Sequence, residues 1–193
     1  MLFNDKFRLH TPGPTPIPPR VQHAMAQPMI GHRSPQFSKI IADCSERLRP
    51  IFGTKQDVLI LTSSGTSALE SAVTNTVQPG DAVTVVVTGA FGDRFAKIAE
   101  RFGCDVHRLE IPWGEHCSPE QLRVHLRQYP RDKAVFMTYC ETSTGVLNPI
   151  KALTKVVREE TEALSIVDGV SCIGAVPMKM DEWGGNIAGT GSQ

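Results

Sequence analysis

Neither charge is in excess in this sequence, and no apolar run is long. The 20 basic residues balance 20 acidic ones, so no net field draws the protein to nucleic acid or to an anionic membrane face. The apolar runs, such as residues 82–87, have the length of a strand and fall far short of the roughly 20 residues that a membrane helix needs. We therefore predict no nucleic-acid partner and no membrane partner, and small molecules as ligands.

The sequence also lacks a recognisable secretion signal and a cysteine framework. Residues 1–6 have neither a basic region followed by an apolar stretch nor a small-residue cleavage site, which favours a cytoplasmic protein. The five cysteines are an odd number without a C-x-x-C pair, which is typical of reduced thiols. One cluster of potential zinc ligands has a spacing that matches no usual zinc module, so we predict no metal site; it consists of Cys104, His107, His116 and Cys117.

A chain of 193 residues that is 40% hydrophobic and 21% charged can bury one sizeable core. Prolines crowd the first 20 residues, where their fixed φ and missing N–H groups oppose helix and strand, so residues 1–20 are expected to form an extended N-terminal arm. Residues 21–193 are expected to form one globular domain. A helix should run from a cap at Ser34 to about Ile51, because proline follows the cap and apolar residues recur at helical spacing.

From Asp57 onward, short runs of β-branched residues alternate with longer amphipathic stretches. This rhythm is typical of strands joined by crossover helices, and it predicts an α/β fold with a mainly parallel sheet in a three-layer αβα arrangement. Ligands of such sheets bind outside the carboxyl ends of the strands, so the residues that follow each strand are candidates for chemistry. Strands are expected at 58–61, 82–88, 104–109, 134–139 and 164–167, and helices at 68–77, 91–102, 119–128 and 151–162.

The turn after the first expected strand is rich in hydroxyl groups and opens a helix; it reads Thr62-Ser63-Ser64-Gly65-Thr66-Ser67. Its N–H groups and the helix dipole would bind a phosphate, and Gly65 would allow close approach of the backbone. An ordinary Ser/Thr helix cap explains the same residues. The turn lacks the lysine of G-x-x-x-x-G-K-[ST] and the glycines of G-x-G-x-x-G, so neither a nucleoside-triphosphatase nor a dinucleotide site is indicated.

Aromatic and acidic side chains follow further strands. Phe91, between two glycines, could lie against a planar ring, or it could be the first core residue of the next helix. Asp168 follows the buried run 163–167, where a carboxylate needs a cationic or proton-sharing partner unless it caps a helix. The loop 140–149 adds hydroxyl donors, and its Glu141 could be a buried carboxylate whose partner the sequence does not identify.

Taken together and in this order, these segments resemble class V pyridoxal-phosphate aminotransferases, in particular the alanine-glyoxylate and serine-pyruvate aminotransferase branch. The resemblance covers nearly the whole sequence. It implies the large domain of a PLP-dependent transferase of fold type I, with pyridoxal 5'-phosphate as cofactor. Seven segments carry it: Thr11-Pro12-Gly13-Pro14-Thr15, Gly31-His32-Arg33-Ser34, residues 63–70, Gly89-Ala90-Phe91-Gly92-Asp93-Arg94, Glu141-Thr142-Ser143-Thr144-Gly145, Val167-Asp168-Gly169-Val170 and Thr190-Gly191-Ser192-Gln193.

The resemblance also implies roles for the residues that would hold the cofactor. Ser64, Gly65 and Thr66 would bind its phosphate. Phe91 would stack on its pyridine ring, at a position where relatives often carry tryptophan, and Val170 would pack against the opposite face of the ring.

The remaining implied roles concern the ring substituents and the substrate. Asp168 would pair with the protonated ring nitrogen and is the expected catalytic residue, because it keeps the electron sink of the cofactor positive. Thr142 and Gln193 would approach the ring hydroxyl, and Gly13 would lie near the substrate.

The implied activity is that of an enzyme, a homodimer that transfers the amino group of alanine or serine to glyoxylate or pyruvate. In the family a lysine that binds the cofactor follows the Gly-Ser-Gln motif; since Gln193 is the last residue here, we expect residues 1–193 to lack the catalytic lysine and the small domain. Two alternatives stay open. One is a cysteine desulfurase or another lyase of the same fold, although such relatives usually have histidine where Phe91 stands; the other is an inert fragment that keeps the phosphate turn.

Overall fold

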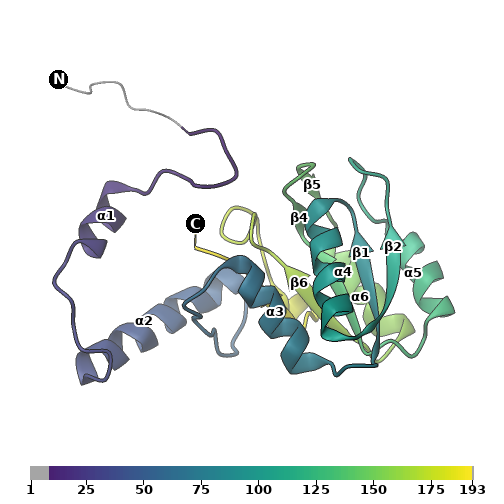
Figure 1. Ribbon diagram of the computed structural model, residues 1–193, viewed down its shortest axis with the longest axis horizontal. Helices are drawn as coiled ribbons and strands as arrows, with labels where there is room; N and C mark the ends of the chain where they lie inside the picture. Colours follow the sequence, from purple (N-terminus) through teal and green to yellow (C-terminus); the bar gives the residue numbers. More distant parts are fainter. Residues whose placement is uncertain (1–8, 193) are drawn as a thin grey trace. The chain divides into compact units, whose positions relative to one another are not determined.

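The computed structural model describes residues 9–192, and its chain divides into two compact units (Figure 1). Residues up to Cys44 belong to the first unit and Ser45–Ser192 form the second. The first helix, α1, spans Pro19–Met25 and follows residues 9–18, which form neither helix nor strand. None of the helices in the described part of the chain is long and apolar enough to cross a membrane.

The second helix, α2, spans Pro35–Phe52 and confirms the helix that the sequence predicts after Ser34. The N–H of Phe37 donates to Ser34 Oγ at 3.2 Å, so the serine caps the first turn as expected. Pro35 occupies the first helical position, where its missing N–H removes no hydrogen bond.

Five parallel strands form the main sheet of the second unit, in the order β2-β1-β3-β6-β7. Two further strands pair antiparallel in a short ribbon outside it. The parallel sheet between crossover helices confirms the predicted α/β class. The strands of the sheet are β1 (Ala82–Val87), β2 (Asp105–Glu110), β3 (Ala134–Thr138), β6 (Leu164–Asp168) and β7 (Ile187–Gly189), and those of the ribbon are β4 (Cys140–Glu141) and β5 (Val146–Leu147).

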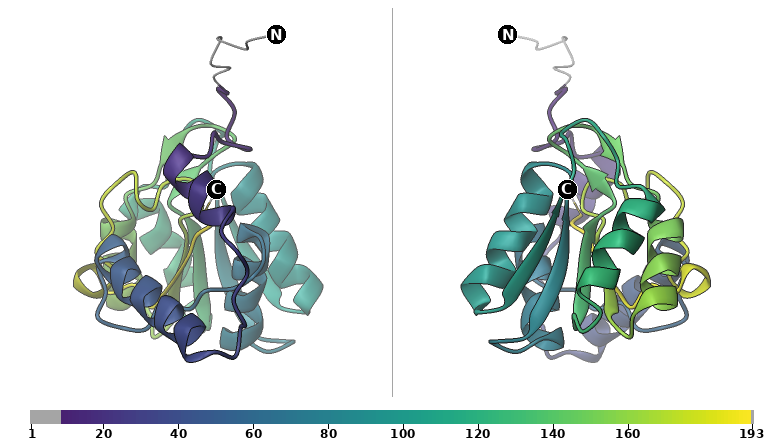
Figure 2. Two further views of the ribbon diagram at one scale, coloured as in Figure 1. Left: turned by 90° about the vertical axis from the view of Figure 1, so that its left-hand side faces the viewer. Right: turned by 90° about the vertical axis from the view of Figure 1, so that its right-hand side faces the viewer.

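Helices cover both faces of this sheet (Figure 2). Side chains alternate along each strand, so Val85 faces the core on one side while Val86 faces the core on the other. This confirms the three-layer αβα arrangement. The helices on the Val85 side are α3 (Gly65–Thr76) and α4 (Ala90–Phe102), and those on the Val86 side are α5 (Pro119–Gln128), α6 (Ile150–Glu160) and the short α7 (Met180–Trp183).

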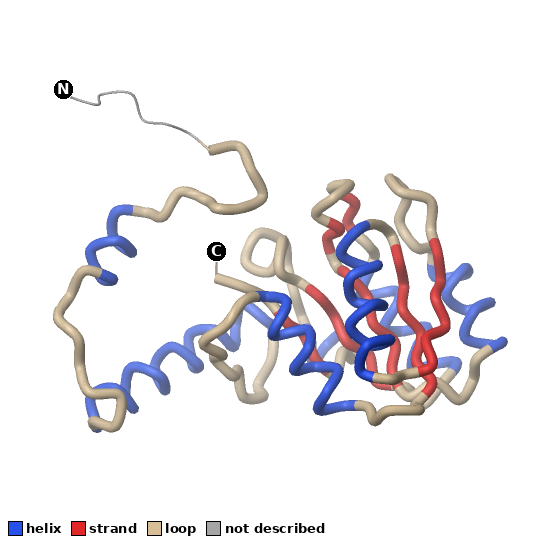
Figure 3. Tube along the Cα trace, in the orientation of Figure 1, coloured by secondary structure: helices blue, strands red, loops and turns tan. Residues whose placement is uncertain are grey.

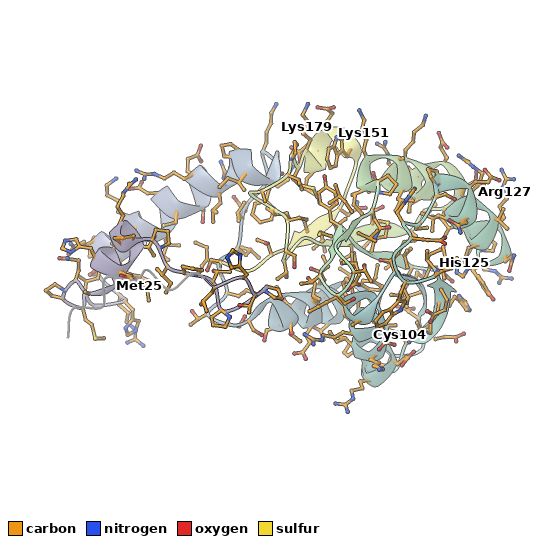
Figure 4. The ribbon with its side chains drawn as sticks, turned by 90° about the horizontal axis from the view of Figure 1, so that it is seen from above. Met25, Cys104, His125, Arg127, Lys151 and Lys179 are labelled. Carbon is orange, nitrogen blue, oxygen red and sulfur yellow. The ribbon has the colours of Figure 1, made fainter. Side chains whose placement is uncertain are left out.

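Ion pairs join α5 to α6 on the outer surface of their layer. Arg127, which projects from α5 in Figure 4, donates through Nε to Glu160 at 2.9 Å. Arg123 on the same helix pairs with Glu160 and with Glu159. Because Arg127 is exposed, this pair contributes little to stability by itself, and the buried apolar side chains between helix and sheet hold the layer in place.

One predicted strand is wrong: residues 58–61 form no strand and lie in the loop between α2 and α3 (Figure 3). Leu59 is 81% exposed, and Ile60 and Leu61 are about half exposed. A β-branched run becomes a strand only when a neighbouring strand satisfies its backbone groups, and within residues 9–192 no strand pairs with this segment. Five short elements that the sequence pattern did not predict are α1, β4, β5, β7 and α7, and α1 begins at Pro19, inside the arm expected at residues 1–20.

Candidate functional site

The order of the strands identifies one edge of the sheet as the candidate site. From β1 the chain passes to β2 on one side and then returns to β3 on the other, so the order reverses between β1 and β3. In parallel α/β sheets ligands bind at the carboxyl edge next to such a reversal. The residues that follow β1 and β3, and Asp168 at the end of β6, lie along this edge.

The N-terminus of α3 lies at this edge and offers hydrogen-bond donors. Ser64 is its N-cap, and Ser64 Oγ accepts from the N–H of Ser67 at 3.4 Å, so the ordinary capping role is present. The N–H groups of Gly65 and Thr66, however, have no acceptor among residues 9–192. Unpaired donors at the positive end of a helix are able to receive an anion, which makes this turn a candidate for the predicted phosphate contact.

Gly65 is required here for steric reasons. A Cβ built on Gly65 would lie 2.7 Å from Val170 Cγ2, which is closer than real Cβ contacts. Val170 follows β6, so this contact joins the α3 turn directly to the loop that begins at Asp168. Gly191, which follows β7, lies close to both Gly65 and Val170. A Cβ built on Gly191 would lie 3.8 Å from the Gly65 nitrogen and 3.9 Å from Val170 Cγ1.

The N-terminus of α4, by contrast, is already satisfied by an acid of the chain itself. The carboxylate of Glu141 accepts the N–H of Phe91 at 3.2 Å and the N–H of Gly92 at 3.0 Å. Ser143 Oγ accepts the N–H of Ala90 at 3.0 Å and donates to Glu141 at 2.6 Å. Glu141 is fully buried. These contacts identify the partner of Glu141 that the sequence left open, and they leave α3 as the helix end that can receive an external anion.

Asp168 is a buried carboxylate with few partners. Its side chain accepts one hydrogen bond, from the N–H of Val170 at 3.0 Å, and the residue is 3% exposed. Burial raises its pKa to about 6; the charge of Glu141 acts in the same direction, while the Val170 N–H and the charge of Arg94 oppose the shift. No cationic side chain within residues 9–192 forms an ion pair with it. A carboxylate in this environment is stabilised by a cationic or proton-sharing ligand.

Phe91 begins α4 at the same edge and is partly buried. The guanidinium carbon of Arg94 lies 4.7 Å from the centre of the Phe91 ring. Arg94 Nη1 also lies 3.5 Å from Thr66 Oγ1, so this side chain spans from α4 to the first turn of α3. Thr142 forms a hydroxyl contact with Ser171, which joins the turn between β4 and β5 to the loop after β6.

Six of the residues singled out from the sequence therefore lie along one edge of the second unit: Ser64, Gly65, Thr66, Phe91, Asp168 and Val170. Thr142 lies in the turn between β4 and β5, and its hydroxyl contacts Ser171 after β6. Gln193 falls outside the described residues. Gly13 belongs to the first unit, where residues 11–14 form a bend, and its place near a substrate stays a prediction.

Two polar residues at this edge were not assigned a role from the sequence. Arg94 stands three positions after Phe91, one helical turn along α4, and this spacing is the signal that could have drawn attention to it. Ser171 immediately follows Val170, but serine is too common in loops to have signalled a contact with Thr142.

Comparison with known proteins decides the family. Residues 9–193 match the model of the family described as Aminotransferase class-V. The chain belongs to this family. Class V membership also makes pyridoxal 5'-phosphate the cofactor and makes the fold that of PLP-dependent transferases of fold type I.

Among its relatives, the chain is 41% identical to the soluble hydrogenase small subunit of Synechococcus sp., over 99% of this chain and 50% of that protein. It is 39% identical to the serine–glyoxylate aminotransferase of Methylorubrum extorquens, over 96% of this chain and 47% of that one. The crystal structure of ureidoglycine-glyoxylate aminotransferase from Bacillus subtilis superposes with a TM-score of 0.90 at 36% identity, covering 94% of this chain and 47% of that chain. The chain thus spans about half the length of the relatives it matches.

The chemistry of the edge fits this cofactor. A phosphate ester needs N–H and hydroxyl donors, and the α3 turn provides both. A pyridinium nitrogen needs a carboxylate, and Asp168 is buried without a cationic partner among the described residues. Phe91, in the first turn of α4 at the same edge, offers an aromatic surface.

Proposed function

We propose that this chain forms the cofactor-binding part of an aminotransferase that moves the amino group of a small amino acid, alanine or serine, to glyoxylate or pyruvate. The observation that carries the proposal is the buried Asp168 carboxylate at one edge of a sheet that also presents the α3 turn. A buried carboxylate with a raised pKa, and with no ion pair to a cationic side chain among the described residues, suits a ligand that brings its own positive charge.

The α3 turn would bind the phosphate group. The N–H groups of Gly65 and Thr66 and the hydroxyl of Ser64 are the donors that we assign to it. Backbone donors cost no side-chain ordering on binding, so they hold an anion in a fixed position. The contact between Gly65 and Val170 would keep this position constant relative to Asp168.

When bound, the cofactor supplies an electron sink that stabilises negative charge at the Cα atom of an amino acid substrate. In our proposal Asp168 accepts a hydrogen bond from the ring nitrogen and keeps the proton on that atom. A low-polarity environment strengthens this interaction, because burial removes the water that would otherwise screen it.

Other residues would orient the ring and exclude water from it. Phe91 would stack against one face and Val170 would pack against the other. Thr142 and Gln193 would approach the ring hydroxyl, and Gly13 would lie near the substrate. Glu141 would act indirectly, since it holds the N–H of Phe91 and with it the start of α4.

The choice of substrates rests on the names of two relatives and on the family resemblance. Glyoxylate is the acceptor in the names of both the Methylorubrum and the Bacillus proteins. Their donors, serine and ureidoglycine, are small molecules, which agrees with a small amino donor here. We further propose the division into an arm at residues 1–20 and a PLP-binding domain from residue 21, a homodimer, and a cytoplasmic location.

The test is a set of turnover and binding measurements on the complete protein. We expect visible absorbance from bound pyridoxal phosphate, formation of glycine from glyoxylate with alanine or serine as donor, and a rate lowered by orders of magnitude in Asp168→Ala. Release of sulfide from cysteine without transamination would instead indicate a desulfurase. If neither activity is found and no cofactor absorbance is seen, the chain is an inert fragment and the proposal is contradicted.

A further inference from the structure

Arg94 is a charged residue at the candidate site for which the family resemblance gives no role. It lies on α4 one turn after Phe91, and its Nη1 atom is 3.5 Å from Thr66 Oγ1 in the first turn of α3. Its guanidinium also lies over the Phe91 ring at 4.7 Å. One side chain therefore touches both the turn proposed for the phosphate and the aromatic ring proposed for stacking.

Arg94 forms no ion pair in the described part of the chain, although Asp93 precedes it directly and the charge of Arg94 lowers the pKa of Asp168. Its neighbour Asp93 pairs with Lys97 at 2.6 Å and with Arg108. Glu141 is occupied by the start of α4. The contact with Phe91 is a weak interaction at an exposed position. The guanidinium is thus available for an anion.

The α3 turn needs such a cation if it binds a phosphate ester. Residues 62–67 include no charged side chain, and a helix N-terminus provides the equivalent of only about half a positive charge. A phosphate monoester carries about −1.5 to −2 charges at neutral pH. Neutral donors alone would leave most of that charge uncompensated, whereas a guanidinium provides one full charge and a planar fork of N–H donors.

We propose that Arg94 is a further binding residue for the cofactor phosphate, reaching it across the N-termini of α3 and α4. This inference rests on the proposed function. It adds a charged side chain to a site otherwise composed of backbone N–H groups and hydroxyls. Because Arg94 is exposed, its contribution should be a moderate one.

The test compares two ligands that differ by the phosphate. Pyridoxal phosphate and pyridoxal are titrated against the cofactor-free complete protein, for the wild type, Arg94→Gln, Arg94→Lys and Arg101→Gln. Arg101 is an exposed arginine in the last turn of the same helix and serves as the matched control. We expect Arg94→Gln to raise the Kd of pyridoxal phosphate about tenfold and to leave that of pyridoxal unchanged. Arg94→Lys should recover part of the loss, and Arg101→Gln should have no effect.

Inorganic phosphate gives a second readout that requires no turnover. It should compete with pyridoxal phosphate in the wild type and compete less well in Arg94→Gln. Equal effects on both vitamers, no effect on either, or a raised KM for the amino donor with unchanged Kd for pyridoxal phosphate would overturn the role of Arg94 alone. A wild-type protein that binds neither vitamer would overturn the proposed function, and this inference with it.

Discussion

The carboxylate of Glu141 accepts the N–H of Gly92 at 3.0 Å, which joins β4 to the first turn of α4 across the point where the strand order reverses. The same carboxylate accepts the N–H of Phe91 and two hydrogen bonds from Ser143. It is therefore a built-in anion that completes one helix end at the candidate site. Its position fixes the backbone from which the Phe91 side chain projects.

Removal of this carboxylate should destabilise the fold. In Glu141→Ala, the N–H groups of Phe91 and Gly92 lose their acceptor in a buried region, and each unsatisfied group costs about 1–3 kcal/mol. We expect the free energy of unfolding to fall by about 3 kcal/mol, measured by urea denaturation. The exposed Glu115 provides the control, since Glu115→Ala should change stability by less than about 0.5 kcal/mol. A loss no larger than that of the control would contradict this account of Glu141.

A methyl group at Gly89 should have a comparable effect from the opposite side of the contact. A Cβ on Gly89 would lie 2.6 Å from Glu141 Cγ and from Ser143 Oγ, so Gly89→Ala should push the carboxylate away from α4. Such overpacking costs about 1–3 kcal/mol. Gly31→Ala is the control, because nothing lies within 4 Å of its Cβ position. Thermal unfolding of both variants measures the difference, and equal melting temperatures would count against the steric argument.

The raised pKa of Asp168 predicts a specific pH dependence of stability. Since the folded pKa is about 6 and the ordinary value is 3.8, the folded state retains this proton after the unfolded state has lost it. The protein without bound cofactor should therefore lose stability as pH rises from about 4 to above 6, by up to about 3 kcal/mol. Asp168→Asn, which has no charge to bury, should lack this loss. Urea denaturation of both forms across this pH range measures it, and parallel curves would refute it.

Ser64 should contribute to both stability and binding. As N-cap of α3 it accepts the N–H of Ser67, so Ser64→Ala should cost about 1 kcal/mol of unfolding free energy. It should also weaken binding of pyridoxal phosphate, because the hydroxyl is one of the proposed phosphate donors. Thr66→Ala separates the two effects: it keeps the Ser64 cap and removes the hydroxyl that accepts a hydrogen bond from Arg94, so this variant should weaken binding through Arg94 without loss of the capping energy. Denaturation combined with cofactor titration tests both expectations.

Much of the fold was accessible from the sequence because the pattern and the final packing agree. The runs 82–88 and 134–139 are long enough to show β-branched composition, and the structure has β1 and β3 there. The run 58–61 has the same composition and no strand, because pairing depends on a partner that local sequence does not report. Strand β7 has three residues, too few for a periodic signal.

The same limit applies to the candidate site. The sequence pointed to Asp168 because a carboxylate after a buried strand is unusual, and a motif pointed to the α3 turn. It could not assign the partners of Glu141 or the reach of Arg94, since both depend on contacts between residues 28 or more positions apart. Long-range contacts of polar side chains follow from topology, and topology became known only with the structure.

The backbone amides at the N-termini of α3 and α4 should also differ in their rate of hydrogen exchange. Amide hydrogens of Phe91 and Gly92 are held by an acceptor that arrives with folding itself, so their exchange with solvent deuterium should be slow whether or not a ligand is present. Those of Gly65 and Thr66 have no such acceptor within residues 9–192 and should exchange rapidly until an anion binds. The N-terminus of α4 is thus complete without a ligand, and the exchange rate of the Gly65 and Thr66 amides should report directly whether an anion is bound at α3.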